Sequence, residues 1–202
     1  EEPVAAALGA GLDISAPHGS LVVDIGGGTT DMAILSLSGI SISASIKTAG
    51  NVFDDAVIKY VRRKYNLIIG SRMAEEAKIA IGCVYPRREL LTHRVKGRNA
   101  MTGLPQFADI TSDEMLEAMI EPAMLIVRSL QDILERTPPE LVGDVYEDGG
   151  VLTGGSAQIF GFPQLLSRKA KLPVRLAEAP ADCVALGAGK AIRYIDDMDK
   201  KE

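Results

Sequence analysis

A short apolar run that ends abruptly in three glycines constrains this sequence more than any other feature. Residues 21–25 read LVVDI, and Gly26, Gly27 and Gly28 follow directly. An apolar run of this length is typical of a buried strand, and the glycines end it. Because glycine has no Cβ, successive N–H groups can converge on one anion such as a phosphate. A glycine-rich hairpin turn without a ligand is the alternative interpretation.

The residues that flank these glycines suit a phosphate site. Thr29 and Thr30 can add hydroxyl donors, and Asp24, at the end of the strand, is placed to hold a hydrated Mg²⁺ ion. The segment matches neither the dinucleotide-binding pattern GxGxxG nor the P-loop pattern GxxxxGKS/T. The sequence therefore predicts a phosphate-binding turn of another kind.

A second glycine pair follows a second apolar run. Residues 151–153 read VLT, and Gly154, Gly155, Ser156 and Ala157 come next. Bare glycines at the end of a strand allow a flat ring to lie close to the backbone. A tight connection between a strand and a helix, with no ligand, is the alternative.

A predicted helix between the two glycine segments carries Glu75 and Lys78, three residues apart on one face. These side chains could grip a ribose or the edge of a purine. The alternative is an exposed ion pair, which contributes only about 0.3 kcal/mol.

Strand and helix patterns alternate along the chain, which predicts the α/β class. Residues 32–37 and 40–46 predict an antiparallel hairpin that turns at Ser38 and Gly39. Further strands are predicted over residues 90–95, 107–110, 149–153 and 174–176, and a loop over residues 96–106.

Helix starts are indicated by capping residues. Thr111 and Glu114 fit a capping box for a helix to residue 135, which Pro122 kinks and two prolines at 138 and 139 stop. Asn51 and Asp182 are predicted to cap helices over 51–65 and 182–195. Other helices are predicted over residues 4–11, 71–81, 157–160 and 163–169.

Composition excludes several classes of partner. The net charge of −5 argues against a nucleic-acid binder, since phosphate backbones attract clustered Lys and Arg. No apolar run reaches the 18 residues of a membrane span, and no signal segment opens the chain. The two cysteines, Cys83 and Cys183, lie far apart and away from both histidines, which predicts buried thiols rather than a zinc site. We therefore expect a cytoplasmic protein.

Several motifs in a fixed order carry a resemblance to a known family. They occupy residues 1–7, 24–31, 50–54, 74–82, 152–157 and 185–189. Their order resembles the superfamily of actin, sugar kinases and DnaK-type chaperones. Residues 75–82, 96–105 and 137–141 resemble, within it, the MreB/Mbl family of bacterial actin-like proteins. The resemblance covers essentially the whole chain.

The resemblance implies the actin-like ATPase fold, of the ribonuclease H type, with a mixed sheet and an antiparallel hairpin at the phosphate loop. Residues 21–70 and 137–181 would form the nucleotide-facing core, and residues 71–136 a smaller inserted subdomain. Residues 1–20 would cross over from a first domain, to which a helix over 182–202 returns. The family's first phosphate loop has no match here, so we expect a piece of a longer protein that binds ATP weakly and does not turn it over alone.

The resemblance also assigns roles to residues. Glu2 matches the family's water-positioning or general-base residue, and Asp24 the aspartate near Mg²⁺. The second phosphate loop, residues 26–29, and the adenosine loop, residues 154–157, match the two glycine segments. Glu75 and Lys78 match residues beside the ribose and adenine. Ser156 departs from the usual third glycine and would narrow the adenine slot, and Asp31 stands where the family more often has Glu.

The implied activity is that of an ATP- and Mg²⁺-binding cytoskeletal protein. It would polymerise head to tail with itself, govern cell shape and cell-wall synthesis, and contact membrane proteins of that machinery through this domain, with no membrane site of its own here. The apolar segment 159–163 would be a subunit contact or core packing. Two alternatives remain: a DnaK-type chaperone ATPase that works as a clamp, and a kinase-like phosphotransferase for sugars or acetate.

Overall fold

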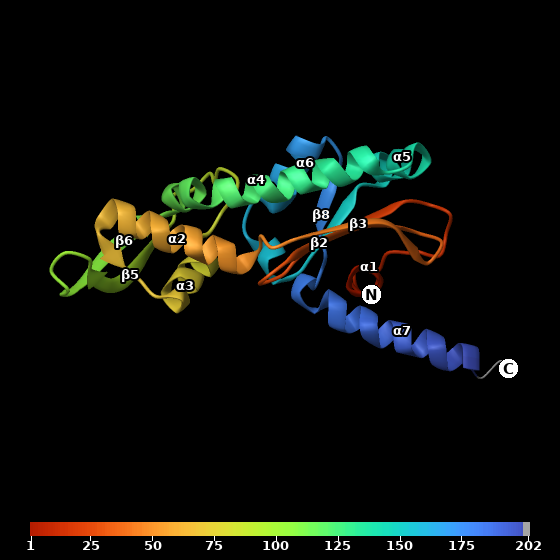
Figure 1. Ribbon diagram of the computed structural model, residues 1–202, viewed down its shortest axis with the longest axis horizontal. Helices are drawn as coiled ribbons and strands as arrows, with labels where there is room; N and C mark the ends of the chain where they lie inside the picture. The colour runs from red at the N-terminus through yellow and green to blue at the C-terminus, as the bar shows by residue number, and fades with distance from the viewer. Residues whose placement is uncertain (200–202) are drawn as a thin grey trace.

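Two β-sheets at opposite ends of an elongated molecule organise the chain (Figure 1). The computed structural model describes residues 1–199, and the side chains of residues 1–192. The larger sheet has the strand order β3-β2-β1-β7-β8. Its strands are β1 (Ser20–Ile25), β2 (Thr30–Ser36), β3 (Gly39–Ile46), β7 (Gly150–Thr153) and β8 (Val174–Leu176).

The larger sheet is mixed, as the resemblance implies. β1, β2 and β3 pair antiparallel, whereas β7 and β8 run parallel to β1. The first glycine segment is the hairpin loop between β1 and β2, and the second follows β7. Because β1 and β7 are parallel neighbours, both glycine segments emerge at the same edge of the sheet.

The β2–β3 turn differs from the prediction by one residue. Leu37 and Ser38 form the turn, with φ of 51° and 62°, and Gly39 already pairs with Ser36. Two positive φ angles in a two-residue loop match the twist of a hairpin, although glycine or asparagine usually supplies them. Here the N–H of Leu37 donates to the Ala16 carbonyl, at 3.1 Å, and that of Ser38 donates to the Ile14 carbonyl. These contacts with the preceding loop hold the turn.

The smaller sheet has the order β4-β5-β6 and is antiparallel, from β4 (Leu67–Ile68), β5 (Thr92–Asn99) and β6 (Pro105–Thr111). The predicted loop over residues 96–106 is therefore wrong, because only residues 100–104 lie outside the strands. The predicted strand over residues 90–95 covers only the first half of β5, because the residues of β5 are mostly exposed or half-buried and only Val95 is buried. β4 was missed, and it lies before residue 71, so the predicted domain boundary there falls between two paired strands.

Helices cover both sheets and connect them. They are α1 (Glu2–Gly9), α2 (Gly50–Tyr65), α3 (Ser71–Ile81), α4 (Ser112–Arg136), α5 (Pro139–Asp148), α6 (Phe162–Ala170) and α7 (Cys183–Asp199), with the 3-10 turns η1 (Gly155–Gln158) and η2 (Pro180–Asp182). α2 and α3 lie with the smaller sheet, and α4 runs from that sheet to the larger one (Figure 1). α1 and α7 pack against each other on the opposite side of the larger sheet from α4 (Figure 1).

Helix boundaries test the capping predictions. Thr111 and Glu114 form the predicted capping box of α4, which continues through Pro122 to Arg136. The pair of prolines does end α4, but Pro139 then begins α5, a helix the sequence analysis did not predict. Pro is well suited to a first helical position because its missing N–H has no helical partner there.

Two predicted helix starts are corrected. Ala49 precedes the first residue of α2, so Asn51 is the second helical residue and not its cap. The helix predicted over residues 157–160 is the 3-10 turn η1, which begins two residues earlier, at Gly155. α7 does begin directly after Asp182, which belongs to η2.

The main core lies between the larger sheet and helices α2, α4 and α6, and it continues into the smaller sheet. A second cluster packs α1 against the opposite face of the larger sheet. α1 and α7 approach closely at Gly9 and Gly187, where a Cβ would lie 1.8 Å from the Cys183 carbonyl and 1.7 Å from the Ala5 carbonyl, respectively. The larger sheet is therefore packed on both faces, and both glycine segments emerge at one of its edges.

Candidate functional site

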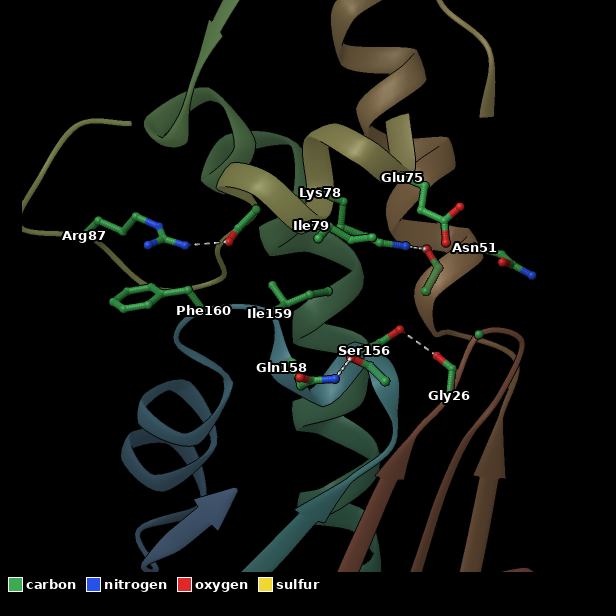
Figure 2. Close-up of a pocket in the computed structure, with 14 residues that line it drawn as sticks. Gly26, Asn51, Glu75, Lys78, Ile79, Arg87, Ser156, Gln158, Ile159 and Phe160 are labelled. Carbon is green, nitrogen blue, oxygen red and sulfur yellow. Dashed lines mark hydrogen bonds between the residues drawn. The ribbon is translucent and has the colours of Figure 1, made fainter. Parts of the chain in front are cut away.

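A cavity of about 700 Å³ opens between the two glycine segments and α3 (Figure 2). Its volume lies in the range of pockets that hold small molecules and cofactors. Several predicted site residues line it together: Gly26, Gly27, Glu75, Lys78, Gly155 and Ser156. The sequence analysis did not assign the other lining residues, which are Gly50, Asn51, Ile79, Gly82, Arg87, Gln158, Ile159 and Phe160.

The first glycine loop has a row of free backbone donors. Gly26 donates its N–H to the Thr29 carbonyl, at 3.0 Å, across the β1–β2 turn. Among the residues that the structure describes, the N–H groups of Gly27, Gly28 and Thr29 have no hydrogen-bond partner, and all three residues are exposed. Consecutive free N–H groups in a turn form a concave site for an anion.

The carbonyl groups of the same loop hold it in place. The Gly26 carbonyl accepts from the Gly50 N–H at 3.1 Å and from the Ser156 hydroxyl at 2.7 Å. The Gly27 carbonyl accepts from the Asn51 N–H at 2.8 Å. The loop is therefore fastened to the start of α2 and to the second glycine segment, while its N–H groups stay available.

The second glycine segment packs tightly on one side and is open on the other. Gly154 has φ of 89°, and a Cβ there would lie 2.4 Å from the Ile25 carbonyl, so only glycine fits without strain. A Cβ on Gly155 would meet nothing within 4 Å. Ser156, the departure from the usual glycine, is buried and bridges the two glycine segments, while Ala157 belongs to the core.

Asp24 is a buried carboxylate with little compensation. It is 5% exposed, and its Oδ1 accepts from the Thr153 hydroxyl at 2.6 Å. Burial raises the pKa of Asp24 against the lowering effect of that hydrogen bond, and the neighbouring Asp31 raises it further. A cation nearby would stabilise the ionised form, so the residue suits a hydrated Mg²⁺. Within the described residues no group of three His, Cys, Asp or Glu side chains could hold a metal alone.

Lys78 lines the cavity, but its ammonium group is already bound. Its Nζ lies 3.0 Å from Asp54 Oδ2 and 2.9 Å from Oδ1, and it donates to the Gly50 carbonyl at 3.2 Å. Burial raises the pKa of Asp54, and Lys78 opposes that effect. Glu75 and Lys78 thus form no ion pair with each other, and Lys78 ties α3 to α2.

Seven predicted site residues lie outside the cavity lining: Glu2, Asp24, Gly28, Thr29, Thr30, Gly154 and Ala157. Thr30 is fully buried and its hydroxyl donates to the Thr48 carbonyl at 2.7 Å, so this hydroxyl is not free for a phosphate. Glu2 is the exposed first residue of α1 and is not part of the lining. Gly28 is exposed beside Gly27 at the open end of the loop.

Some of the missed residues had a usable signal. Ile79 follows Lys78 on the same helix, and residues 158–160 directly follow the second glycine segment. In the apolar segment 159–163, Ile159 and Phe162 are buried, which fits the core-packing interpretation, whereas Phe160 is 39% exposed at the cavity. Arg87 had no signal, because it lies at the cavity beside Phe160, which is far from it in the sequence.

The prediction of buried thiols is confirmed away from the cavity. Cys83 and Cys183 are both free and buried, and the Cys83 thiol donates to the Ser112 carbonyl at 3.1 Å. Among the described residues, no helix is both long enough and apolar enough to span a membrane.

Comparison with known proteins agrees with this architecture. The model of the MreB/Mbl protein family matches residues 1–200. The cell shape-determining protein Mbl of Bacillus cereus is 46% identical over 201 residues, which are 100% of this chain and 60% of that protein. The cell shape-determining protein MreB of Escherichia coli K12 is 48% identical over 196 residues, which are 97% of this chain and 56% of that protein.

Comparison with solved structures also supports this architecture. MreB 5 of Spiroplasma citri bound to AMPPNP superposes with a TM-score of 0.96 at 38% identity, over 100% of this chain and 60% of that one. The MamK double helical filament, with a TM-score of 0.78 over 96% of this chain and 58% of that one, is 23% identical and shows the fold alone. The predicted actin-like α/β fold is therefore confirmed. The chain spans about 60% of the length of the relatives that it matches.

Proposed function

Because the chain belongs to the MreB/Mbl family of cell shape-determining proteins, we propose that its cavity binds Mg·ATP in a protein that polymerises into filaments. The observation that carries the proposal is that the two glycine segments lie side by side at one cavity. One offers free N–H groups to phosphates and the other an open, flat surface to a base, and both border one cavity. MreB5 of Spiroplasma citri has been solved bound to AMPPNP and to ADP, which supports a nucleotide as ligand.

The phosphates would lie at the first loop. The N–H groups of Gly27, Gly28 and Thr29 are the donors, and the Gly26 carbonyl fixes their orientation through its bonds to α2 and Ser156. We leave the Thr30 hydroxyl out of this site, since it is bound to the Thr48 carbonyl. Asp24 would hold Mg²⁺ through water, and the ion would neutralise phosphate charge.

The nucleoside would lie between α3 and η1. Gly154 sets the path of the backbone, Gly155 and Ser156 border the base, and Ala157 packs beneath them. Glu75, whose carboxylate is exposed at the cavity, can accept hydrogen bonds from ribose hydroxyls. Lys78 acts through its stem and by holding α3 against the start of α2, because its ammonium group is paired with Asp54.

The remaining parts of the proposal follow from the family. Glu2 would position the attacking water, the protein would assemble head to tail with copies of itself, and it would work in the cytoplasm with membrane proteins of the cell-shape machinery. Head-to-tail contacts join different surfaces of each subunit, so they can extend into open filaments. The MamK structure is itself a filament, which supports self-association of this fold. We expect the 202-residue chain alone to bind Mg·ATP weakly, since the family's first phosphate loop has no match in it.

Blocking the base surface tests nucleotide binding. In the full-length protein, Gly155→Leu adds a side chain at a position that lines the cavity and where a Cβ would have nothing within 4 Å. We expect Mg·ATP affinity, measured by calorimetry, to fall at least tenfold, about 1.4 kcal/mol. Gly143→Leu is the matched control, because its Cβ also meets nothing but lies in α5, away from the cavity. Equal affinities for the two variants would contradict the proposed site.

Sedimentation of the full-length protein with and without ATP tests the filament. A pellet that forms with Mg·ATP supports polymerisation. Nucleotide binding without a pellet indicates a clamp of the chaperone type, and ATP-dependent phosphorylation of a small acceptor indicates a kinase.

A further inference from the structure

The four edge strands of the two sheets differ in how well they are protected against pairing with another chain. β4 has two residues, β8 has three and carries Arg175, and β6 begins at Pro105 and carries Asp109. Short length, charge and proline all discourage a further strand from adding to an edge. The remaining edge strand, β3, has eight residues with the sequence GISISASI, which contains neither a charge nor a proline. β3 is therefore the edge most open to another strand.

The register of β3 shows which of its main-chain groups point out of the sheet. The hydrogen bond across the β1–β2 turn fixes the alternation along β2, so the main chain of Met32 faces β3. Met32 pairs with Ala44, which therefore bonds to β2, while the N–H and carbonyl groups of Ser43 and Ser45 point outward. Among the described residues these four groups have no hydrogen-bond partner. The irregularity in the β2–β3 register lies closer to the turn, so residues 42–46 pair regularly with β2.

The side chains of β3 alternate between two surroundings. Ile42, Ala44 and Ile46 are half-buried and pack against the main core on the side of α4. Ser43 and Ser45 are exposed on the opposite face. Side chains of neighbouring strands continue the same two faces, so a strand beside β3 would alternate in the same way. Its apolar residues would cover the exposed parts of the two isoleucines.

One charge marks the end of this edge. Lys47 follows β3 directly, is exposed, and forms no ion pair among the described residues. An added strand with an acidic residue at the corresponding position would place opposite charges side by side. The edge thus favours an acidic residue in a strand that binds there.

We propose that β3 is the docking site for an extended segment of a partner protein, which adds to the larger sheet as a further strand. The segment has alternating apolar and polar residues and an acidic residue beside Lys47. Main-chain hydrogen bonds to Ser43 and Ser45 supply affinity, and the alternating side chains supply specificity. β3 contributes no residue to the lining of the nucleotide cavity, so this inference can be tested without nucleotide.

A synthetic peptide probes the edge on the full-length protein. It alternates valine and threonine and has a glutamate at each end, so that either strand direction brings a glutamate near Lys47. Binding is measured by fluorescence anisotropy of the labelled peptide. In a strand, only one alternate set of amide N–H groups faces β3. N-methylation of that set, either the valines or the threonines, should abolish binding, and N-methylation of the other set should leave it nearly unchanged.

A substitution at Ser43 tests the same bonds from the side of the protein. Ser43→Pro removes an outward N–H, and proline is tolerated where the N–H of an edge strand faces solvent. We expect peptide affinity to fall about tenfold, the equivalent of one lost hydrogen bond. Ser43→Thr is the matched control, because it keeps the N–H and suits a strand. The peptide should also slow amide exchange at Ser43 and Ser45 but not at Ala44, which already bonds to β2.

Several results would overturn the proposal. They are the absence of binding by the unmethylated peptide, equal binding by the two methylated peptides, and equal affinities of Ser43→Pro and the unmodified protein. If Ser43→Pro does not fold, the pair of methylated peptides still decides. Loss of sedimentation with Mg·ATP in a folded Ser43→Pro variant would show that the edge pairs with a second copy of the chain, which also contradicts a separate partner.

Discussion

Two of the buried carboxylates, Asp24 in the larger sheet and Glu114 beside the smaller sheet, have opposite surroundings. Asp24, in the larger sheet, is 5% exposed, and Thr153 is its only hydrogen-bond donor among the described residues. Glu114, beside the smaller sheet, is 7% exposed and accepts from Tyr65, from Lys64 and from the capping residue Thr111.

Their pKa values shift in opposite directions for this reason. Burial raises the pKa of both groups. For Asp24 a single hydrogen bond does not compensate, so its pKa stays raised. For Glu114 the bonds from Lys64, Tyr65 and Thr111 outweigh burial and lower its pKa to about 2. The comparison indicates that Glu114 stabilises the fold, whereas Asp24 retains the capacity to interact with a cation.

Substitution of Asp24 should give the largest effect, and on binding rather than stability. Asp24→Asn keeps an oxygen for the Thr153 hydroxyl but removes the charge that would hold hydrated Mg²⁺. We expect Mg·ATP affinity to fall up to about a hundredfold, in the range seen when metal-supporting groups are lost. The free energy of unfolding should change by less than about 1 kcal/mol, because a poorly compensated buried charge is removed. Calorimetry and urea unfolding measure the two quantities.

The control for Asp24→Asn is ATP binding in the presence of a chelator, which should not differ between the variant and the unmodified protein. A large loss of stability with unchanged Mg·ATP affinity would assign Asp24 to the fold, as for Glu114.

Substitution of Glu114 should lower stability and leave nucleotide binding nearly unchanged, the reverse of the effect expected for Asp24→Asn. Glu114→Gln weakens hydrogen bonds to a charged acceptor and leaves Lys64 without its partner, so we expect the free energy of unfolding to fall by about 2 kcal/mol. Mg·ATP affinity should change less than twofold. Glu117→Gln is the matched control: it also contacts α2, through the Tyr60 hydroxyl at 2.6 Å, but it is exposed, so its loss should be under about 1 kcal/mol. Equal losses for the two variants would show that burial of Glu114 does not matter.

Lowering the pH should remove part of the stabilisation that the Glu114 carboxylate gives to the fold. The folded-state pKa of Glu114 is about 2 and its ordinary value is 4.5, so its stabilisation is fully present above about pH 4.5 and is lost as pH falls toward 2. Asp24 has a raised pKa and acts in the opposite sense, since its protonation favours the folded state. Urea unfolding between pH 5 and pH 3 should show a shallower loss for Glu114→Gln than for the unmodified protein. Parallel profiles would contradict this assignment.

The burial of each strand explains whether the sequence predicts it. Strands β1 and β7 are buried on both faces, so they appear as continuous apolar runs that glycines end, and both were predicted. β5 has one fully buried residue, Val95, among exposed polar ones, and half of it was predicted as a loop. β4 has two residues, too few for a periodic pattern.

The site was predictable where the backbone forms it. Glycines mark both loops because close approach requires them, as at Gly154. Side-chain roles were less predictable, because they depend on partners far along the chain: Lys78 is bound by Asp54, and the Thr30 hydroxyl by the Thr48 carbonyl. Arg87 reaches the cavity through its contact with Phe160, 73 positions later in the sequence, and no local pattern shows such a pair.

Hydrogen–deuterium exchange of the full-length protein, with and without Mg·ATP, tests the central claim most directly, since it reports on the free N–H groups themselves. Nucleotide should slow exchange in peptides that contain residues 26–29 and 154–159, whereas the β5–β6 turn over residues 100–104 should be unchanged. Unchanged exchange at both glycine segments under saturating nucleotide would contradict the proposal that they form the nucleotide site.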